Sequence, residues 1–175
     1  MTIEPHSAYH FIEGYKSLLT MVNAQSAEPS GLTGSQLLAH SRQLIANNPA
    51  RVHSAVEALT QKSEAVPEDV LAAVQSMQTK QWVYLRDTSK YSVFIDPELE
   101  KAYAVLGLTQ PLKQVLGDSG AMMQTGLMVY RGQYVCDGLF SGQLVWLGAG
   151  YRASFSDNLA DIKKRKNFYN APASR

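Results

Sequence analysis

The stretch from Ala121 to Tyr151 reads AMMQTGLMVYRGQYVCDGLFSGQLVWLGAGY, and it decides the fold of this chain. Its only charged side chains are Arg131 and Asp137, and glycine recurs through it. A run this poor in charge cannot all face water, because apolar side chains are driven out of contact with solvent. The stretch therefore predicts the buried part of a β-sheet.

Three β-rich runs within this stretch predict an antiparallel meander. Its turns are expected at Arg131-Gly132 and at Ser141-Gly142. Asp137-Gly138 leaves two interpretations open, because this dipeptide is also a strong hairpin signal. We take it as a bulge inside one strand. The three runs are residues 125–130, 133–140 and 143–147.

The bulged strand presents apolar side chains on both of its faces. Tyr134, Cys136 and Phe140 point to one side in that register, whereas Val135 and Leu139 point to the other. Helices of the chain cover one face. The second face needs more of this chain or a second copy, because the closing helix expected over about Ser156–Tyr169 is too basic on its surface. A homodimer is therefore one of the two expected ways to cover this face, and a protein partner or a second copy is the expected kind of partner.

A hairpin is predicted upstream, where Trp82–Leu85 and Tyr91–Ile95 are two β-rich runs joined by a polar turn. It brings the sheet to about five strands. Asp96-Pro97-Glu98 then has the residues of a helix start, and apolar residues follow at helical spacing up to Gly107. A helix is expected there, with one more turn over Pro111–Leu116. The apolar residues of the expected helix are Leu99, Tyr103 and Leu106.

The front of the chain is predicted to be helical, with the spacing of apolar residues and the proline-led starts typical of four helices. Glu28-Pro29-Ser30-Gly31 is expected to end the first of them, and Thr33 or Ser35 to cap the second. The helix propensity of these segments is too low for them to be stable as isolated helices in water, so they must pack on the sheet. Their expected ranges are Pro5–Ala27, Ser35–Asn47, Pro49–Ser63 and Pro67–Thr79.

The predicted fold is therefore α+β, a helical half packed on an antiparallel sheet and closed by a C-terminal helix. One domain is expected over residues 1–175, because this length is typical of a single domain. Residues 1–80 form its helical part and 81–170 its sheet part with short helices. Residues 171–175 form a loose tail.

The composition is that of an ordinary soluble protein, with 45% hydrophobic residues, 18% charged residues and a formal net charge of +1. The single cysteine, Cys136, excludes an intrachain disulfide, so a cytoplasmic setting is expected. The first residues lack the pattern of a signal peptide. No window is apolar enough to cross a bilayer, and we expect no membrane contact.

Two short motifs are better explained without a ligand. Gly148–Ala153 matches the loose form of a dinucleotide fingerprint, but it comes too late in the chain and beside antiparallel strands. His6 and His10 would share one helix face, yet two imidazoles do not make a metal site. We expect no metal and no cofactor.

Cys136-Asp137 is the most tempting catalytic pair, because it lies in the least charged strand. A neighbouring carboxylate raises the pKa of a thiol, however, and no histidine follows His53 to activate it. We interpret Cys136 as a structural residue and assign no catalytic residue. Asp137 needs a partner if it is buried, and Arg131 or Arg152 is the expected one.

The run Lys163, Lys164, Arg165 and Lys166 could bind nucleic acid if it shared a surface with other basic residues. Cations also favour the C-terminal end of a helix, and this is the interpretation that we prefer. Nucleic acid is therefore not an expected partner. The basic residues that would have to join the run are Lys90, Lys113, Arg131 and Arg152.

The sequence favours a non-enzymatic binding or assembly module that acts through protein–protein contacts, because it shows no legible catalytic set. A first alternative is a small-molecule-binding or enzymatic domain with a pocket between sheet and helices. A second alternative is a weak nucleic-acid binder that uses the basic C-terminal helix. The candidate ligand-binding residues are Tyr84, Tyr134, Asp137, Trp146 and Arg152.

Overall fold

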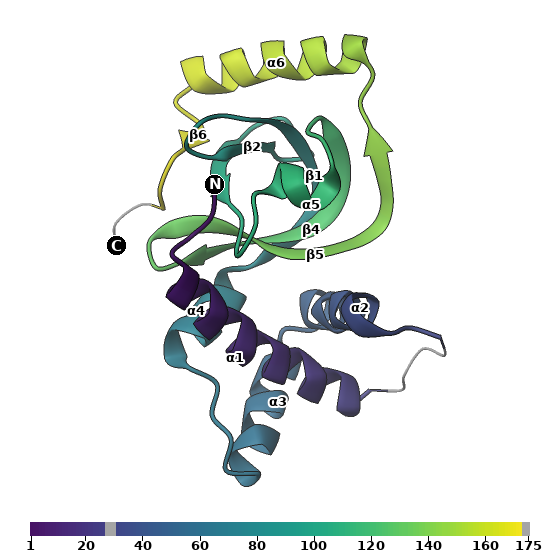
Figure 1. Cartoon of the computed structure of the whole chain (residues 1–175), viewed down its shortest axis with the longest axis vertical. Helices are drawn as coiled ribbons and strands as arrows, with labels where there is room; N and C mark the ends of the chain where they lie inside the picture. Colours follow the sequence, from purple (N-terminus) through teal and green to yellow (C-terminus); the bar gives the residue numbers. More distant parts are fainter. Residues whose placement is uncertain (27–30, 173–175) are drawn as a thin grey trace.

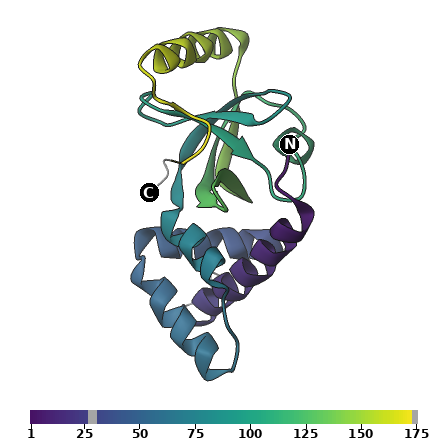
Figure 2. The ribbon, with the colours of Figure 1, turned by 90° about the vertical axis from the view of Figure 1, so that its left-hand side faces the viewer.

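The computed structural model describes residues 1–26 and 31–172, and it has three layers. A β-barrel forms the middle layer. The four N-terminal helices pack on one side of it, and the C-terminal helix lies on the opposite side (Figures 1 and 2). The α+β class is confirmed. Glu28, Pro29 and Ser30, which were expected to end the first helix together with Gly31, fall outside the described residues, and the helix already ends at Ala24 rather than at Ala27.

The four N-terminal helices are confirmed, with ends close to those expected. Glu4 caps the first of them, since its carboxylate accepts hydrogen bonds from the backbone N–H groups of His6 and Ser7, both at 2.8 Å. Thr33 precedes the second without a side-chain cap bond. The fourth ends at Ser76, not Thr79, because the first strand already begins at Gln78. The helices are α1 (Pro5–Ala24), α2 (Gly34–Asn47), α3 (Ala50–Gln61) and α4 (Glu68–Ser76).

The sheet has six strands rather than five, and five of them close into a barrel. The strand order is β2-β1-β4-β5-β3-β6, and β2 also pairs with β3, which closes the ring. Pairing is antiparallel except where β3 meets β5 and β6. The strands are β1 (Gln78–Asp87), β2 (Ser92–Ile95), β3 (Ala102–Leu106), β4 (Ala121–Tyr130), β5 (Gln133–Trp146) and β6 (Phe168–Tyr169).

The prediction of a helix after Asp96 is wrong, because this segment forms a tight turn followed by β3. One oxygen of the Asp96 carboxylate accepts hydrogen bonds from the backbone N–H groups of Glu100 (2.8 Å) and Lys101 (3.0 Å). The chain is thereby turned back alongside β2, with which β3 pairs over four residues. Strand pairing on two sides and burial of residues 102–105 outweigh a helical spacing that rests on three apolar residues.

The predicted turn at Ser141-Gly142 is wrong as well. The two runs on either side of it form one strand, because β5 continues unbroken to Trp146. Asp137-Gly138 is a bulge inside this strand, as expected. Leu127 pairs with Cys136 and Thr125 with Phe140, so one residue of β4 lies opposite three of β5. Gly138 has a φ of 73°, a conformation that glycine adopts without strain.

The two faces of β5 alternate as predicted. Cys136 and its neighbours on the same face pack inside the barrel, together with Leu112 of the short helix α5 (Leu112–Leu116). Val135 and Leu139 pack against the helices. The face that carries Cys136 is therefore covered by more of this chain, through closure of the barrel, which is the first of the two expected alternatives.

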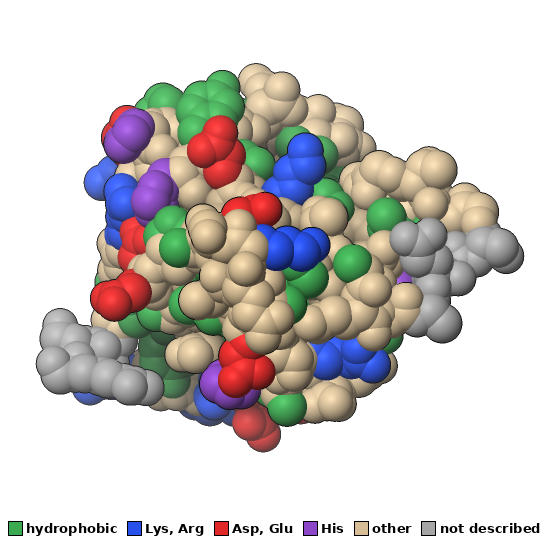
Figure 3. All heavy atoms as spheres, turned by 90° about the horizontal axis from the view of Figure 1, so that it is seen from below, with side chains coloured by type: hydrophobic (Ala, Val, Ile, Leu, Met, Phe, Trp, Pro, Cys, Tyr) green, Lys and Arg blue, Asp and Glu red, His purple; other side chains and the backbone are tan. Residues whose placement is uncertain are grey.

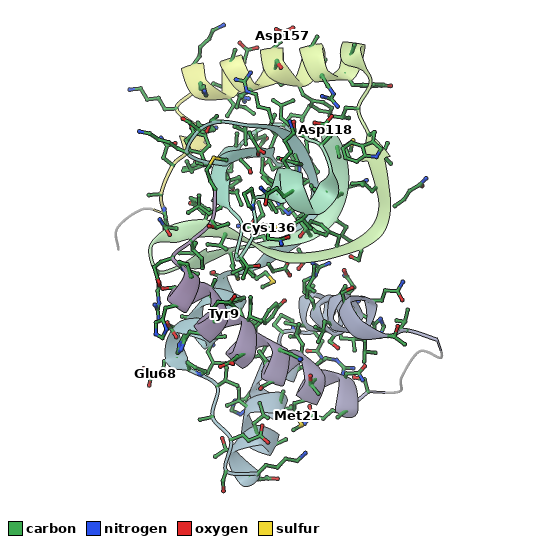
Figure 4. The ribbon with its side chains drawn as sticks, viewed as in Figure 1. Tyr9, Met21, Glu68, Asp118, Cys136 and Asp157 are labelled. Atoms are coloured by element: carbon green, nitrogen blue, oxygen red, sulfur yellow. The ribbon has the colours of Figure 1, made fainter. Side chains whose placement is uncertain are left out.

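The C-terminal helix α6 (Ala149–Lys164) begins seven residues earlier than expected and ends before β6. Leu159 and Ile162 on its inner side are fully buried against the outer face of β1 and β2, whereas Asp157 points away from the barrel (Figure 4). Basic residues on the solvent side do not prevent this packing. Among residues 1–26 and 31–172, none of the helices combines the length and the apolar character that a bilayer crossing requires.

Candidate functional site

The most unusual group in the molecule is a buried ion pair between the helical layer and the barrel. Asp137 lies at the bulge of β5, on the strand face that turns toward the helices, and Arg42 comes from α2. Arg42 Nη1 lies 3.2 Å from Asp137 Oδ2, and the two side chains are 1% and 0% exposed. The prediction that Arg131 or Arg152 pairs with Asp137 is therefore wrong.

Asp137 accepts several further hydrogen bonds, which together account for its burial. The hydroxyl of Tyr15 in α1 donates to it at 3.3 Å, and that of Thr125 in β4 at 3.1 Å. The backbone N–H groups of Gly126 and Leu139 donate at 3.3 and 3.1 Å. The carboxylate thus joins α1, α2, β4 and β5 at one point.

Arg42 also bonds beyond Asp137, but one of its donors remains unused. Its guanidinium donates to the carbonyl oxygen of Leu139 and, at 2.8 Å, to the hydroxyl of Ser141. Its Nε is buried and has no hydrogen-bond partner among the described residues. The burial of Arg42 could have been predicted from the sequence. Arg42 stands four residues after Leu38 and three before Ile45, and this spacing places it on the apolar stripe of α2.

The neighbouring thiol and phenol are held in their neutral forms. Burial, with a contribution from the charge of Asp137, raises the pKa of Cys136 to about 12. Burial and the same carboxylate raise the pKa of Tyr15 well above its ordinary value. Figure 4 shows Cys136 on the side of the barrel nearest the helices. A thiol with this pKa is protonated at neutral pH and is a poor nucleophile in that form.

A cavity of about 520 Å³ lies between the helices and the start of β1, and Arg42 and Tyr15 line it. Its volume is within the range of small-molecule sites. We call it the helical cavity. Its lining is mostly apolar and consists of Tyr15, Arg42, Ile45, Ala46, Pro49, Val52, His53, Val56, Leu71, Val74, Gln75, Met77 and Thr79.

The last five residues of β5, Gly142–Trp146, form an exposed apolar edge, which we call the β5 edge. Leu144, Val145 and Trp146 are 38%, 42% and 46% exposed. On one side this segment pairs with β4, whereas β3 pairs with β5 only at Tyr134 and Val135. Among the described residues, therefore, no strand pairs with the other side of the β5 edge, and Figure 1 shows β5 swinging out along the barrel there.

The candidate ligand-binding residues are not brought together. Tyr84 is buried inside the barrel and donates a hydrogen bond to Asp87, whereas Tyr134 is half-buried beside Tyr103. Trp146 lies on the β5 edge. Arg152 packs over Gly120 and donates from its Nε to the carbonyl oxygen of Leu147 at 3.0 Å.

The basic residues considered for nucleic acid do not all lie together, although Lys113 and Arg152 both pair with Asp118, each at 3.7 Å. Arg131 forms a 2.8 Å ion pair with Asp69 of α4, in the helical layer, whereas residues 163–166 lie at the end of α6 across the barrel. Lys164 pairs with Asp161 at 3.0 Å. Figure 3 shows the opposite end of the molecule, the helical layer, where acidic and basic side chains are interspersed.

The described residues contain no group of three or more metal-ligating side chains, and His10 is hydrogen-bonded to Asp69 at 3.0 Å instead. Comparisons with family models, with curated proteins and with solved structures give no match to this chain.

The barrel itself has the architecture of an OB-fold, a five-stranded Greek-key barrel, with α5 between β3 and β4. Such barrels bind oligonucleotides or oligosaccharides on the face of their second and third strands. Here α6 packs over part of that outer face, on Val93 and Ile95 of β2 and Ala102 of β3. An analogy of architecture alone does not assign a function.

Proposed function

We propose that this protein is an assembly module, in which the β5 edge pairs with the β5 edge of a second copy. The observation that supports the proposal is the exposure of Leu144, Val145 and Trp146 along a strand segment with no neighbour on one side among the described residues. An unpaired strand edge presents N–H and C=O groups that are satisfied by an added strand.

The β5 edge lacks the devices that normally prevent such pairing. Natural sheets protect an open edge with proline or with lysine and other charged residues, or they cover the edge with a helix or loop. No charged residue and no proline occurs from Gly138 to Tyr151. Leu144, Val145 and Trp146 would instead lose contact with water when a partner strand is added, which favours association.

The lack of charge also favours a second copy over a different partner. In a two-fold symmetric pair the same segment contacts itself, so any charged residue near the axis would meet its own like charge. Antiparallel pairing of two β5 edges brings only uncharged side chains together, and it extends both barrels into one continuous sheet.

The test compares two substitutions of equally exposed valines. Val145→Lys places a cation on the β5 edge, whereas the control Val115→Lys changes a valine of α5 that is 46% exposed. We expect the wild type and Val115→Lys to have the mass of two chains in light scattering. We expect Val145→Lys to weaken the dimer roughly tenfold or more, because every dimer then carries two lysines along the paired edges.

Cross-linking of single cysteines gives the geometry of the pair. Cysteines introduced one at a time at Gln143, Leu144, Val145 and Trp146 should form an interchain disulfide most readily at the position nearest the two-fold axis and less readily away from it. Cys136 is buried and does not interfere. A wild type that stays monomeric at high concentration, or cross-linking that is equal at all four positions, would contradict the proposal.

A further inference from the structure

We propose that Tyr151 of each copy inserts into a pocket beside α2 of the other copy. The inference rests on the pairing of two β5 edges proposed above, and it names the side chain that anchors this pairing. The pocket has a volume of about 400 Å³ and lies where α2 meets β4 and β5. We call it the α2 pocket. It is lined by Leu32, Gln36, Ala39, His40, Gln43, Gln124, Phe140, Ser141 and Gly142.

The β5 edge has the α2 pocket at one end and Tyr151 at the other. Gly142, the first residue of the edge, lines the pocket. Trp146, the last residue of the edge, is followed closely by α6, which carries Tyr151 in its first turn. Figure 1 shows the same arrangement, since β5 runs from the side of α2 to the start of α6.

Antiparallel pairing of two such edges brings their opposite ends together. The whole edge is paired when the two-fold axis passes at Leu144, so Gly142 of one copy then lies opposite Trp146 of the other. Paired strands are about 5 Å apart, and the first turn of the second copy's α6 therefore comes to lie beside the α2 pocket. The two-fold symmetry repeats this contact at the other end of the paired edges.

The alternation of side chains along β5 excludes Trp146 as the occupant. Trp146 pairs with Ala121 and Val145 with Met122, and residues that are paired across two strands share one face. Met122 and Gln124 share a face of β4, because they are two residues apart in a regular strand. Gln124 lines the α2 pocket. Trp146 therefore points to the opposite face of the continuous sheet.

Tyr151 lies on the apolar stripe of α6, yet the described part of the chain leaves it uncovered. It stands four residues before Phe155 and eight before Leu159. Both of these residues pack with Met122 on the outer face of the barrel, which is the face of the α2 pocket. The side chain of Tyr151 is nonetheless 69% exposed, more than any other large hydrophobic side chain among the described residues. Such an aromatic side chain, next to an apolar edge, is typical of an interface.

The lining of the α2 pocket suits a phenol, which needs apolar contacts for its ring and polar groups for its hydroxyl. Phe140 and two aliphatic side chains provide the first, and amide, imidazole and hydroxyl side chains provide the second. The polar wall is already ordered in the single chain. Gln124 donates from its Nε2 to Gln43 Oε1 at 3.0 Å, and the hydroxyl of Ser141 donates to Gln124 Oε1 at 3.2 Å.

The first experiment measures the dissociation constant of the dimer by sedimentation equilibrium. Tyr151→Ala removes two anchors from every dimer, whereas the control Tyr9→Ala removes a tyrosine of α1 that is 62% exposed and does not line the α2 pocket. We expect Tyr151→Ala to weaken the dimer roughly tenfold or more and Tyr9→Ala to change its dissociation constant by less than about twofold. Both side chains are largely exposed, so neither substitution disturbs the core.

The second experiment locates the contact in mixed dimers. A chain with Tyr151→Cys is mixed with a chain that carries Gln36→Cys in the α2 pocket or, as the control, Asn47→Cys at the other end of α2. Both of these α2 residues are exposed. We expect an interchain disulfide to form several-fold more readily with Gln36→Cys, because only this position comes within bonding distance of the second copy's α6.

The two failures can be told apart. A wild type that is monomeric would overturn both the anchor and the pairing of β5 edges. A dimer that is as stable with Tyr151→Ala as without it, or a disulfide that forms as readily with Asn47→Cys as with Gln36→Cys, would overturn the anchor alone.

Discussion

At the scale of single residues, neither Asp137 nor Arg42 can be removed alone without leaving the other charge buried and unpaired. The carboxylate is charged, buried and bonded to donors from four elements, and Arg42 is its only cationic partner among the described residues. Burying two charges is costly, but leaving one of them alone is far more so. The pair therefore determines how α2 is placed against β5 more than it adds net stability.

Arg42→Met tests this interpretation by removing the cation while retaining most of the side-chain volume. We expect the free energy of unfolding in urea to fall by about 3–5 kcal/mol, because the carboxylate of Asp137 is left without compensation. Arg51→Met is the control, since Arg51 makes one hydrogen bond to Ser26 at 2.8 Å and is only half-buried. It should lose about 1 kcal/mol or less. Equal losses in the two variants would mean that the buried pair has no special role.

At the scale of elements, the bulge of β5 depends on a glycine in the facing strand. A Cβ atom on Gly126 of β4 would lie 2.8 Å from Asp137 Oδ2 and 2.7 Å from Met77 Sδ. Met77 can rotate away, but the carboxylate is held by its hydrogen bonds and cannot. The absence of a side chain at Gly126 is thus what allows the carboxylate to reach the backbone of β4.

Substitution of two glycines by alanine should have opposite effects on stability. Gly126→Ala is expected to destabilise by about 1–3 kcal/mol, because the added methyl overpacks the site of Asp137. Gly150 lies in α6, and a methyl group added there would meet nothing within 4 Å, so Gly150→Ala should stabilise by about 0.5–1 kcal/mol through helix propensity. Thermal unfolding measures both. A Gly126→Ala chain as stable as the wild type would show that the bulge tolerates a side chain there.

At the scale of the whole molecule, the helical layer and the barrel share a hydrophobic core and are also joined by polar contacts. Besides the Arg42–Asp137 pair, Arg131 at the β4–β5 turn is bonded to Asp69 of α4 at 2.8 Å, and Tyr130 donates to the backbone of Ser7 at 3.2 Å. Burial raises the pKa of Asp69, but its hydrogen bonds with Arg131 and His10 outweigh this and the pKa is lowered. The carboxylate of Asp69 therefore stays charged to a lower pH than an ordinary aspartate.

These contacts predict that the two layers unfold together. Trp146→Phe leaves Trp82, inside the barrel, as the only tryptophan, so its fluorescence reports on the barrel. Circular dichroism at a helical wavelength reports mainly on α1–α4 and α6. We expect the two signals to share one urea midpoint, as in a two-state transition. Loss of helix at a lower urea concentration than the change in Trp82 would show that the layers are separate units.

The sequence by itself determined the features that depend on near neighbours in the chain. The four helices follow from apolar spacing and proline-led starts, the β1–β2 hairpin from two short β-rich runs, and the bulge at Asp137-Gly138 from a glycine that adopts a positive φ. The alternation of Cys136 and Val135 between two faces follows from the two-residue period of a strand.

Only the tertiary structure decided what depends on residues far apart. Ala102–Leu106 is a strand because β2 and β5 pair with it, and the barrel closes because β2 reaches β3. Arg42 pairs with Asp137 across 95 positions of the chain, a distance at which local pattern carries no information. The exposure of Leu144, Val145 and Trp146 has the same cause: low charge predicts burial, but burial requires a neighbour, and the fold places none of the described strands there.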